Sequence, residues 1–128
     1  MHRRAQVRGQ SLVEFALVLP LLILILLGIL DLGRAFSAYI VITNAARDGA
    51  YYGTMHPTET SAIIQRVLTE ANGSGTSITA ADVSVSTTGA VGTPIRVTVT
   101  HNFALLTSFL PGLTSLHLTS KAEMMIVR

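Results

Sequence analysis

The chain reads RGQSLVEFALVLP from Arg8 to Pro20, and an aliphatic run continues from there to Leu30. Glu14 interrupts this apolar stretch, and the residues from Phe15 to Leu30 carry no charge at all. The apolar segment approaches the roughly 20 residues that a helix needs to cross a bilayer. We therefore expect a membrane-spanning helix near the N-terminus.

A basic leader precedes the apolar segment. Residues 1–9 contain three arginines, so the positive-inside rule predicts that this end of the chain stays in the cytoplasm. A secretory signal peptide has its small-residue cleavage site after the apolar run, whereas the candidate here, Gly9, comes before it. Cleavage after Gly9 would remove the leader and leave the whole apolar helix on a mature protein that begins with Gln10.

Two blocks of the sequence resemble a known family. Gly9 followed by Gln10, with Glu14 at the fifth position after the cut, resembles the processing site of class III signal peptides, those of type IV pilins and pseudopilins. The version GQSLVEFALVLP resembles the TadE-like branch, which is associated with tight-adherence (Flp-type) pili. The block NAARDGAYYG, from Asn44 to Gly53, resembles the same branch at the end of its N-terminal helix.

The resemblance implies a structural role. It implies an inner-membrane precursor with its head outside the cytoplasm, cut by a prepilin peptidase and extracted by an ATP-driven pilus assembly machinery into a filament of like chains or other pilins. The filament would lie at the cell surface and serve adhesion. TadE-like proteins act either as minor pseudopilins or as major subunits, and the sequence leaves both open.

The composition supports an anchored chain and not an ordinary soluble domain. Of the 128 residues, 49% are hydrophobic and 12% charged, and the mean hydropathy is +0.54. The formal net charge of +2 belongs to the precursor: three of the nine basic residues lie in the leader, which leaves six against seven acidic residues after Gly9. Because no basic patch remains, the composition does not favour a nucleic-acid partner. The absence of cysteine excludes disulfides and thiolate metal sites.

The periodicity predicts an α+β fold with three parts: the leader (1–9), one long helix (10–54) and a head (55–128). Pro20 would favour a kink in the helix, and Gly28 and Gly33 would allow neighbouring helices to approach closely. Beyond Leu30 the helix becomes amphipathic. Its expected apolar face consists of Leu32, Phe36, Tyr39, Thr43, Ala46 and Ala50.

The head is predicted to contain a short second helix and a three-stranded antiparallel sheet. Apolar residues at helical spacing predict a helix from about Thr58 to Ala71. Alternation then predicts strands around 83–86, 94–100 and 116–127, the first two joined as a hairpin. The apolar connection 103–112 is compatible with one short helical turn. The long helix and its short companion would cover the apolar face of the sheet.

Glu14 is the strongest candidate for a functional side chain. A carboxylate within a spanning helix costs about 2.5–3.5 kcal/mol on insertion scales, so it usually has a partner. We predict that Glu14 pairs with the new α-amino group of Gln10 on a neighbouring subunit and sets the register of assembly. The alternative is that Glu14 extends to the lipid headgroups.

Other polar and aromatic side chains are candidates for contacts between subunits. Asp31 and Arg34 are three residues apart, so a local ion pair is the simpler account. The remaining candidates at helix-packing surfaces are Gly28, Gly33, Phe36, Tyr39, Arg47 and Asp48, with Tyr51 and Tyr52 either adhesive or packed.

The sequence offers no pattern of an active site, and we expect no catalytic residue, cofactor or metal. A zinc site would need His101 and His117 to face each other across two strands, and no third ligand has a fitting spacing. The leading hypothesis is a pilin or minor pseudopilin. Its rivals are a single-pass anchored binding protein that does not polymerise and a type II secretion pseudopilin.

Overall fold

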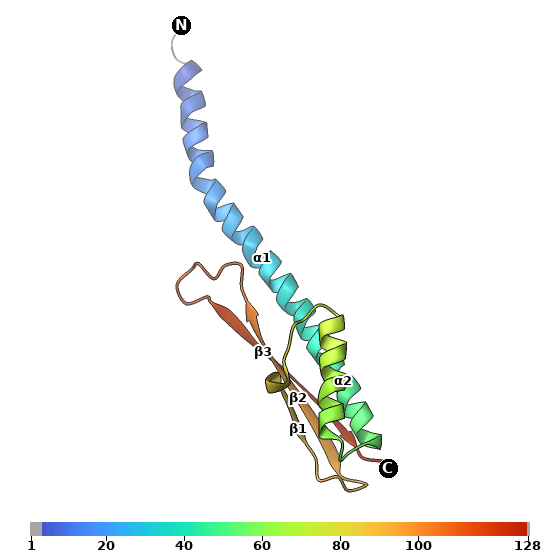
Figure 1. Cartoon of the computed structure of the whole chain (residues 1–128). Coiled ribbons are helices and arrows are strands. Elements are labelled where there is room, and N and C mark those ends of the chain that lie inside the picture. The colour runs from blue at the N-terminus through green and yellow to red at the C-terminus, as the bar shows by residue number, and fades with distance from the viewer. Residues whose placement is uncertain (1–3, 128) are drawn as a thin grey trace.

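The computed structural model describes residues 4–127, with side chains from residue 9 onward, so the three leader arginines lie outside the described side chains. The predicted fold class is confirmed: Figure 1 shows one long helix whose C-terminal half packs, together with a short helix, against a small sheet. The elements in chain order are α1 (Arg4–Met55), α2 (Thr60–Gly73), the 3₁₀ turn η1 (Ala80–Asp82), β1 (Val83–Ser86), β2 (Pro94–Ala104) and β3 (Ser115–Met125).

Helix α1 is continuous for 52 residues, which corresponds to about 78 Å at 1.5 Å per residue. It begins at Arg4 and therefore includes part of the predicted leader, whereas the sequence suggested that the helix starts after Gly9. Pro20 lies inside the helix without ending it, and the axis changes direction within the blue half of α1 in Figure 1. The helix ends just before His56-Pro57, because the residue before a proline disfavours helical geometry.

Helix α2 lies beside the C-terminal half of α1 (Figure 1). It runs two residues later than predicted, and Glu59 is at its N-cap position. Ile63, Val67 and Ala71 recur every four residues and are fully buried, so the predicted apolar stripe is the one that packs.

The sheet has the strand order β1-β2-β3, with both pairs antiparallel. Val85 pairs with Val97, and Val97 pairs with Ala122, so apolar residues from all three strands share the face that the helices cover. Strand β2 extends to Ala104, four residues beyond the predicted end. The residues between β2 and β3 form consecutive turns in place of the short helical turn considered from the sequence.

One core joins the helices to the sheet. Its largest fully buried side chains are Ile42, Ile63, Ile95, Ile126, Val67, Val97 and Val99. Every residue of this set lies in α1, α2, the sheet or the segment just after it, and none lies before residue 42. The N-terminal half of α1 therefore contributes no large side chain to the core of the head.

Candidate functional site

The N-terminal part of α1 projects beyond the head (Figure 1). We call this mainly apolar segment, residues 9–30, the apolar rod. Among the described residues, α1 is the helix with the length and apolar composition to cross a membrane, and none of its most apolar stretch is buried within the chain. Residues 12–30 would span about 28 Å, close to the roughly 30 Å of a bilayer's hydrocarbon core. The exposed large side chains here are Leu12, Val13, Phe15, Leu17, Val18, Leu19, Leu21, Leu22, Ile23, Leu24, Ile25, Leu26, Ile29 and Leu30.

The predicted processing site lies on the exposed surface of this rod. Gly9 is helical and has a negative φ, and an added Cβ would meet no atom within 4 Å. Neither backbone conformation nor packing within the described chain therefore requires glycine at this position. A requirement for a small residue here would come from outside the chain, for example from the site of a peptidase.

Glu14 has a local partner that the sequence analysis did not consider. The side-chain amide of Gln10 donates a hydrogen bond of 3.3 Å to Glu14 Oε1, one helical turn away. A pair of this spacing stabilises a helix by about 0.2–0.5 kcal/mol, which is small beside the cost of a carboxylate in a membrane. The pairing of Glu14 with an α-amino group of another subunit stays a prediction.

The glycines of α1 fall into two groups. At Gly28 and Gly33, an added Cβ would meet nothing within 4 Å. At Gly49 and Gly53, it would collide with the side chains of Val67 and Ile95 respectively. Gly28 lines an open groove beside Leu105 and Leu116, Gly33 is exposed, and both have room for a neighbouring helix. Gly49 and Gly53 instead let α1 approach α2 and the sheet closely. The role of Gly49 and Gly53 was not recognised from the sequence.

The expected apolar face of the C-terminal half of α1 packs on the head only in its last part. Leu32 and Phe36 are 72% and 66% exposed, and Tyr39 is also exposed. The residues that contact the sheet are smaller and lie on a neighbouring stripe that includes Ala35 and Ala38. At Ala35 and Ala38, small residues permit close approach to the head, and Leu32 and Phe36 are left without cover. Further along the helix, Ile42 is large and fully buried. Of the expected face, Ala46 and Ala50 are buried.

Asp31 is the junction between the apolar rod and the head. It is 4% exposed, and its carboxylate accepts hydrogen bonds from Leu106 N–H (2.8 Å), Thr107 N–H (3.0 Å) and the Thr107 hydroxyl (2.9 Å). The expected pair with Arg34 is also present, at 3.0 Å. Four donors offset the cost of burying this charge. Asp31 thus ties the loop between β2 and β3 to α1 directly after the apolar segment.

Arg47 and Asp48 differ in their surroundings. Arg47 is exposed and forms no ion pair with any described residue. Asp48 pairs with Arg66 of α2, at 2.6 Å between Oδ2 and Nε, and this pair links the two helices. The predicted contacts of Arg47 and Asp48 with other subunits stay predictions.

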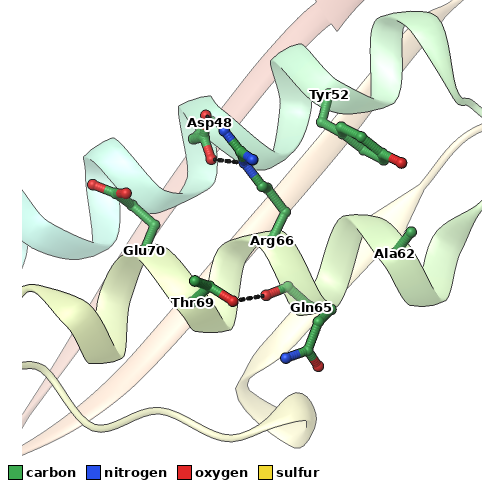
Figure 2. A pocket seen from close by; sticks show the side chains of 7 residues that line it. All are labelled: Asp48, Tyr52, Ala62, Gln65, Arg66, Thr69 and Glu70. Atoms are coloured by element: carbon green, nitrogen blue, oxygen red, sulfur yellow. Dashed lines mark hydrogen bonds and ion pairs between the residues drawn. The ribbon is translucent and has the colours of Figure 1, made fainter.

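An open depression surrounds the Asp48–Arg66 pair. Figure 2 shows Arg66 reaching from α2 to Asp48 on α1, with Tyr52 on the same side. The hydrogen bond and charge of Asp48 raise the pKa of Arg66. Burial, followed by the nearby carboxylate of Glu59, raises the pKa of Tyr52. Neither group therefore titrates near neutral pH, and we assign no acid–base role to this depression.

The remaining aromatic and histidine candidates are separated by the fold. Tyr51 is 60% exposed, whereas Tyr52 stacks on His56 with ring centroids 4.5 Å apart. His101 pairs in register with Leu118, so the neighbouring His117 points to the opposite face of the sheet. These two histidines cannot bind one metal ion together.

Comparison with known proteins bears on α1. Residues 9–50 match the family described as TadE-like protein, which confirms the resemblance seen in the sequence. The match ends before α2, so it covers the long helix and leaves the head outside. No curated protein and no solved structure matches the chain. The family match and the apolar segment fall on the same helix, α1, whose length and composition would allow it to anchor the chain in a membrane.

Proposed function

Because residues 9–50 are TadE-like, we propose that the chain is a structural subunit, a pilin or minor pseudopilin, of a type IV-like tight-adherence pilus. In this proposal it is not an enzyme. A prepilin peptidase cuts after Gly9, and the mature chain joins a filament at the cell surface that serves adhesion.

One observation carries the proposal: the apolar rod of α1 begins with Gly9-Gln10 and finds no cover in its own chain. Lipid covers this rod in the precursor. In a filament, the rods of neighbouring subunits would cover one another, and the heads would face solvent.

The energetics of this transfer explain which residues matter. A helix that moves from lipid to a packed helical core gains little from the hydrophobic effect, because both surroundings are apolar. Close packing and polar pairs must supply the preference, and an ATP-driven machine must supply work. Gly28 and Gly33 would provide the close packing, and Glu14 the polar pair.

Mass spectrometry of the N-terminus tests the proposal. We expect the mature protein to begin at Gln10 and to be recovered in sheared surface filaments. Gly9→Val should remain in the membrane as full-length precursor, because its larger side chain would meet nothing in the chain yet would not fit a peptidase site selective for glycine.

Gly33→Val is the matched control, since an added Cβ is equally free of contacts there, and its processing should be normal. A wild-type chain that keeps Met1 would contradict the proposal and favour a membrane-anchored binding protein. Processing without any filament would favour a subunit that does not polymerise by itself, and dependence on a type II secretion system would favour that rival.

A further inference from the structure

The loop between β2 and β3, residues 105–114, is a second exposed apolar surface. Figure 1 places this loop at the end of the head nearest the apolar rod. From Asn102 to Ser120 the chain contains no Asp, Glu, Lys or Arg. Leu106, Phe109 and Leu113 are 47%, 64% and 49% exposed. Three large apolar side chains on one short loop are unusual for a surface in contact with water.

The position of the loop along α1 is fixed by Asp31. This carboxylate binds the amides of Leu106 and Thr107, and it follows directly on the last residue of the apolar segment. An apolar groove next to this contact is lined both by the loop and its flanks, through Leu105 and Leu116, and by the rod, through Ile25 and Ile29. Ile25 lies six residues before Asp31, about 9 Å further along the helix.

Several backbone amides of the loop have hydrogen-bond acceptors within the chain, which favours surroundings with little water. Its backbone closes on itself, with hydrogen bonds from Ser108 N–H to Leu105 O, from Leu110 N–H to Thr107 O and from Leu113 N–H to Leu110 O. Asp31 satisfies two further amides. Moving a hydrogen-bonded backbone group out of water costs little free energy, whereas moving a backbone group without a hydrogen-bond partner costs several kcal/mol.

We propose that this loop inserts into the interfacial region of the bilayer beside α1, so that the anchored subunit contacts lipid at two places. If residues 12–30 span the hydrocarbon core, Ile25 and Ile29 lie within it, and the loop that shares their groove lies at its boundary. Lipid is therefore the occupant of this surface in the precursor. The inference requires insertion of α1 but not polymerisation, so it survives if the pilus proposal fails.

Tryptophan fluorescence tests the inference, because the full chain contains no tryptophan. Phe109→Trp and Leu113→Trp each place a single reporter on the loop, in the full-length chain reconstituted into phosphatidylcholine vesicles. Val91→Trp is the matched control: Val91 is 68% exposed, on the hairpin at the opposite end of the head. We expect acyl chains that carry bromine to quench both loop reporters several-fold more than the control, with emission at shorter wavelength.

Equal quenching at the loop and at position 91 would overturn the inference. Emission at short wavelength without quenching by bromine would also overturn it, because a second copy of the chain would then cover the loop. The chain has no cysteine, so Ser108→Cys against Ala90→Cys gives an independent measurement with smaller changes. In vesicles, a water-soluble maleimide should label the cysteine at position 108 several-fold more slowly than the cysteine at position 90. Equal labelling rates at the two positions would count against insertion.

Discussion

At the scale of single residues, a substitution of Glu14 is expected to affect filament assembly and membrane insertion differently. Glu14→Leu removes a charge that costs about 2.5–3.5 kcal/mol in a spanning helix, so the precursor should insert at least as well as wild type. If Glu14 pairs with an α-amino group of another subunit, its loss leaves an ammonium group unpaired in an apolar core. We expect normal cleavage but a several-fold lower ratio of sheared-filament to membrane-bound mature subunit.

Glu14→Gln is the control for the local contact with Gln10. It keeps a side-chain oxygen that can accept the hydrogen bond from the Gln10 amide, and it removes the charge. The ion-pair role predicts that both variants assemble poorly. If Glu14→Gln assembles like wild type while Glu14→Leu does not, a hydrogen bond is sufficient, and the ion-pair role is wrong.

Asp31 is more than one half of a local ion pair. Asp31→Ala would leave the amides of Leu106 and Thr107 without an acceptor, and we expect the free energy of unfolding of the head to fall by about 1–3 kcal/mol. Arg34→Gln keeps the hydrogen bonds of the loop to Asp31 and removes the ion pair together with the contact of the guanidinium with the Phe103 ring, whose centroid is 4.9 Å away. Because the Arg34 side chain is half exposed, we expect at most about 1 kcal/mol from the ion pair and about 0.5–1 kcal/mol from the ring contact. Chemical denaturation of both variants in detergent measures the difference. Equal losses would mean that the ion pair dominates and that the loop is not anchored by this carboxylate.

Asp82 makes the stability of the head depend on pH in the acid range. Hydrogen bonds from the Thr79 N–H and hydroxyl, both 2.8 Å, hold the pKa of Asp82 below its ordinary 3.8. A lowered folded pKa means that the stabilisation is complete above 3.8 and is lost as the pH falls through the lower folded value. We expect wild type to unfold at higher temperature than Asp82→Asn at neutral pH, with the difference shrinking in acid. A difference that is constant with pH would contradict this assignment.

At the scale of elements, the close contact of α1 with α2 depends on Gly49. Alanine is the better helix former by about 1 kcal/mol, yet Gly49→Ala should destabilise the head, because the added Cβ would collide with the stiff side chain of Val67. We expect a net loss of about 1–3 kcal/mol, typical of overpacking. Gly33→Ala is the matched control, with no atom near the added Cβ, and it should leave the stability of the head unchanged or higher. Thermal unfolding measures the stability of both variants, and equal unfolding temperatures would contradict this account.

The elements themselves could largely be predicted from the sequence. Alternation of Val97 and Val99 with threonines marks β2, and the stripe through Ile63 and Val67 marks α2, because these patterns report local burial. The face of α1 that packs could not be chosen in this way. Phe36 is more apolar than Ala35, but the small residue packs on the head, and the large one remains exposed in the single chain.

The sequence predicted only those parts of the candidate site that depend on residues close together in the chain. The helix and the ion pair of Asp31 with Arg34 depend on neighbours within a few residues of the chain. The hydrogen bonds of Asp31 to Leu106 and Thr107 join residues 75 and 76 positions apart, and no pattern in a single sequence reports such a contact. The same holds for Asp48, whose partner Arg66 is brought close only by the packing of the two helices.

At the scale of the whole molecule, the chain consists of a rod and a head that share one helix. The rod has no cover within its own chain, whereas the head closes its core with the C-terminal half of α1. Asp31 marks the boundary, because the apolar segment ends before it and the side-chain hydrogen bonds of α1 to the head begin with it. Such a division would let a subunit exchange the surroundings of its rod without refolding its head.

This division predicts that the head folds without the rod. The fragment of residues 29–128 keeps Asp31 and every residue of the core, so it should give a circular dichroism spectrum with both helix and strand, and unfold near the temperature of the full chain in detergent. The fragment of residues 32–128 lacks only three more residues, Asp31 among them, and should unfold at lower temperature because the loop loses its anchor. An all-helical spectrum would contradict the sheet. Equal stability of the two fragments would show that Asp31 does not join rod and head. Self-association of either fragment would leave the division intact, since Phe36, Tyr39 and Ile40 remain exposed on the shared helix.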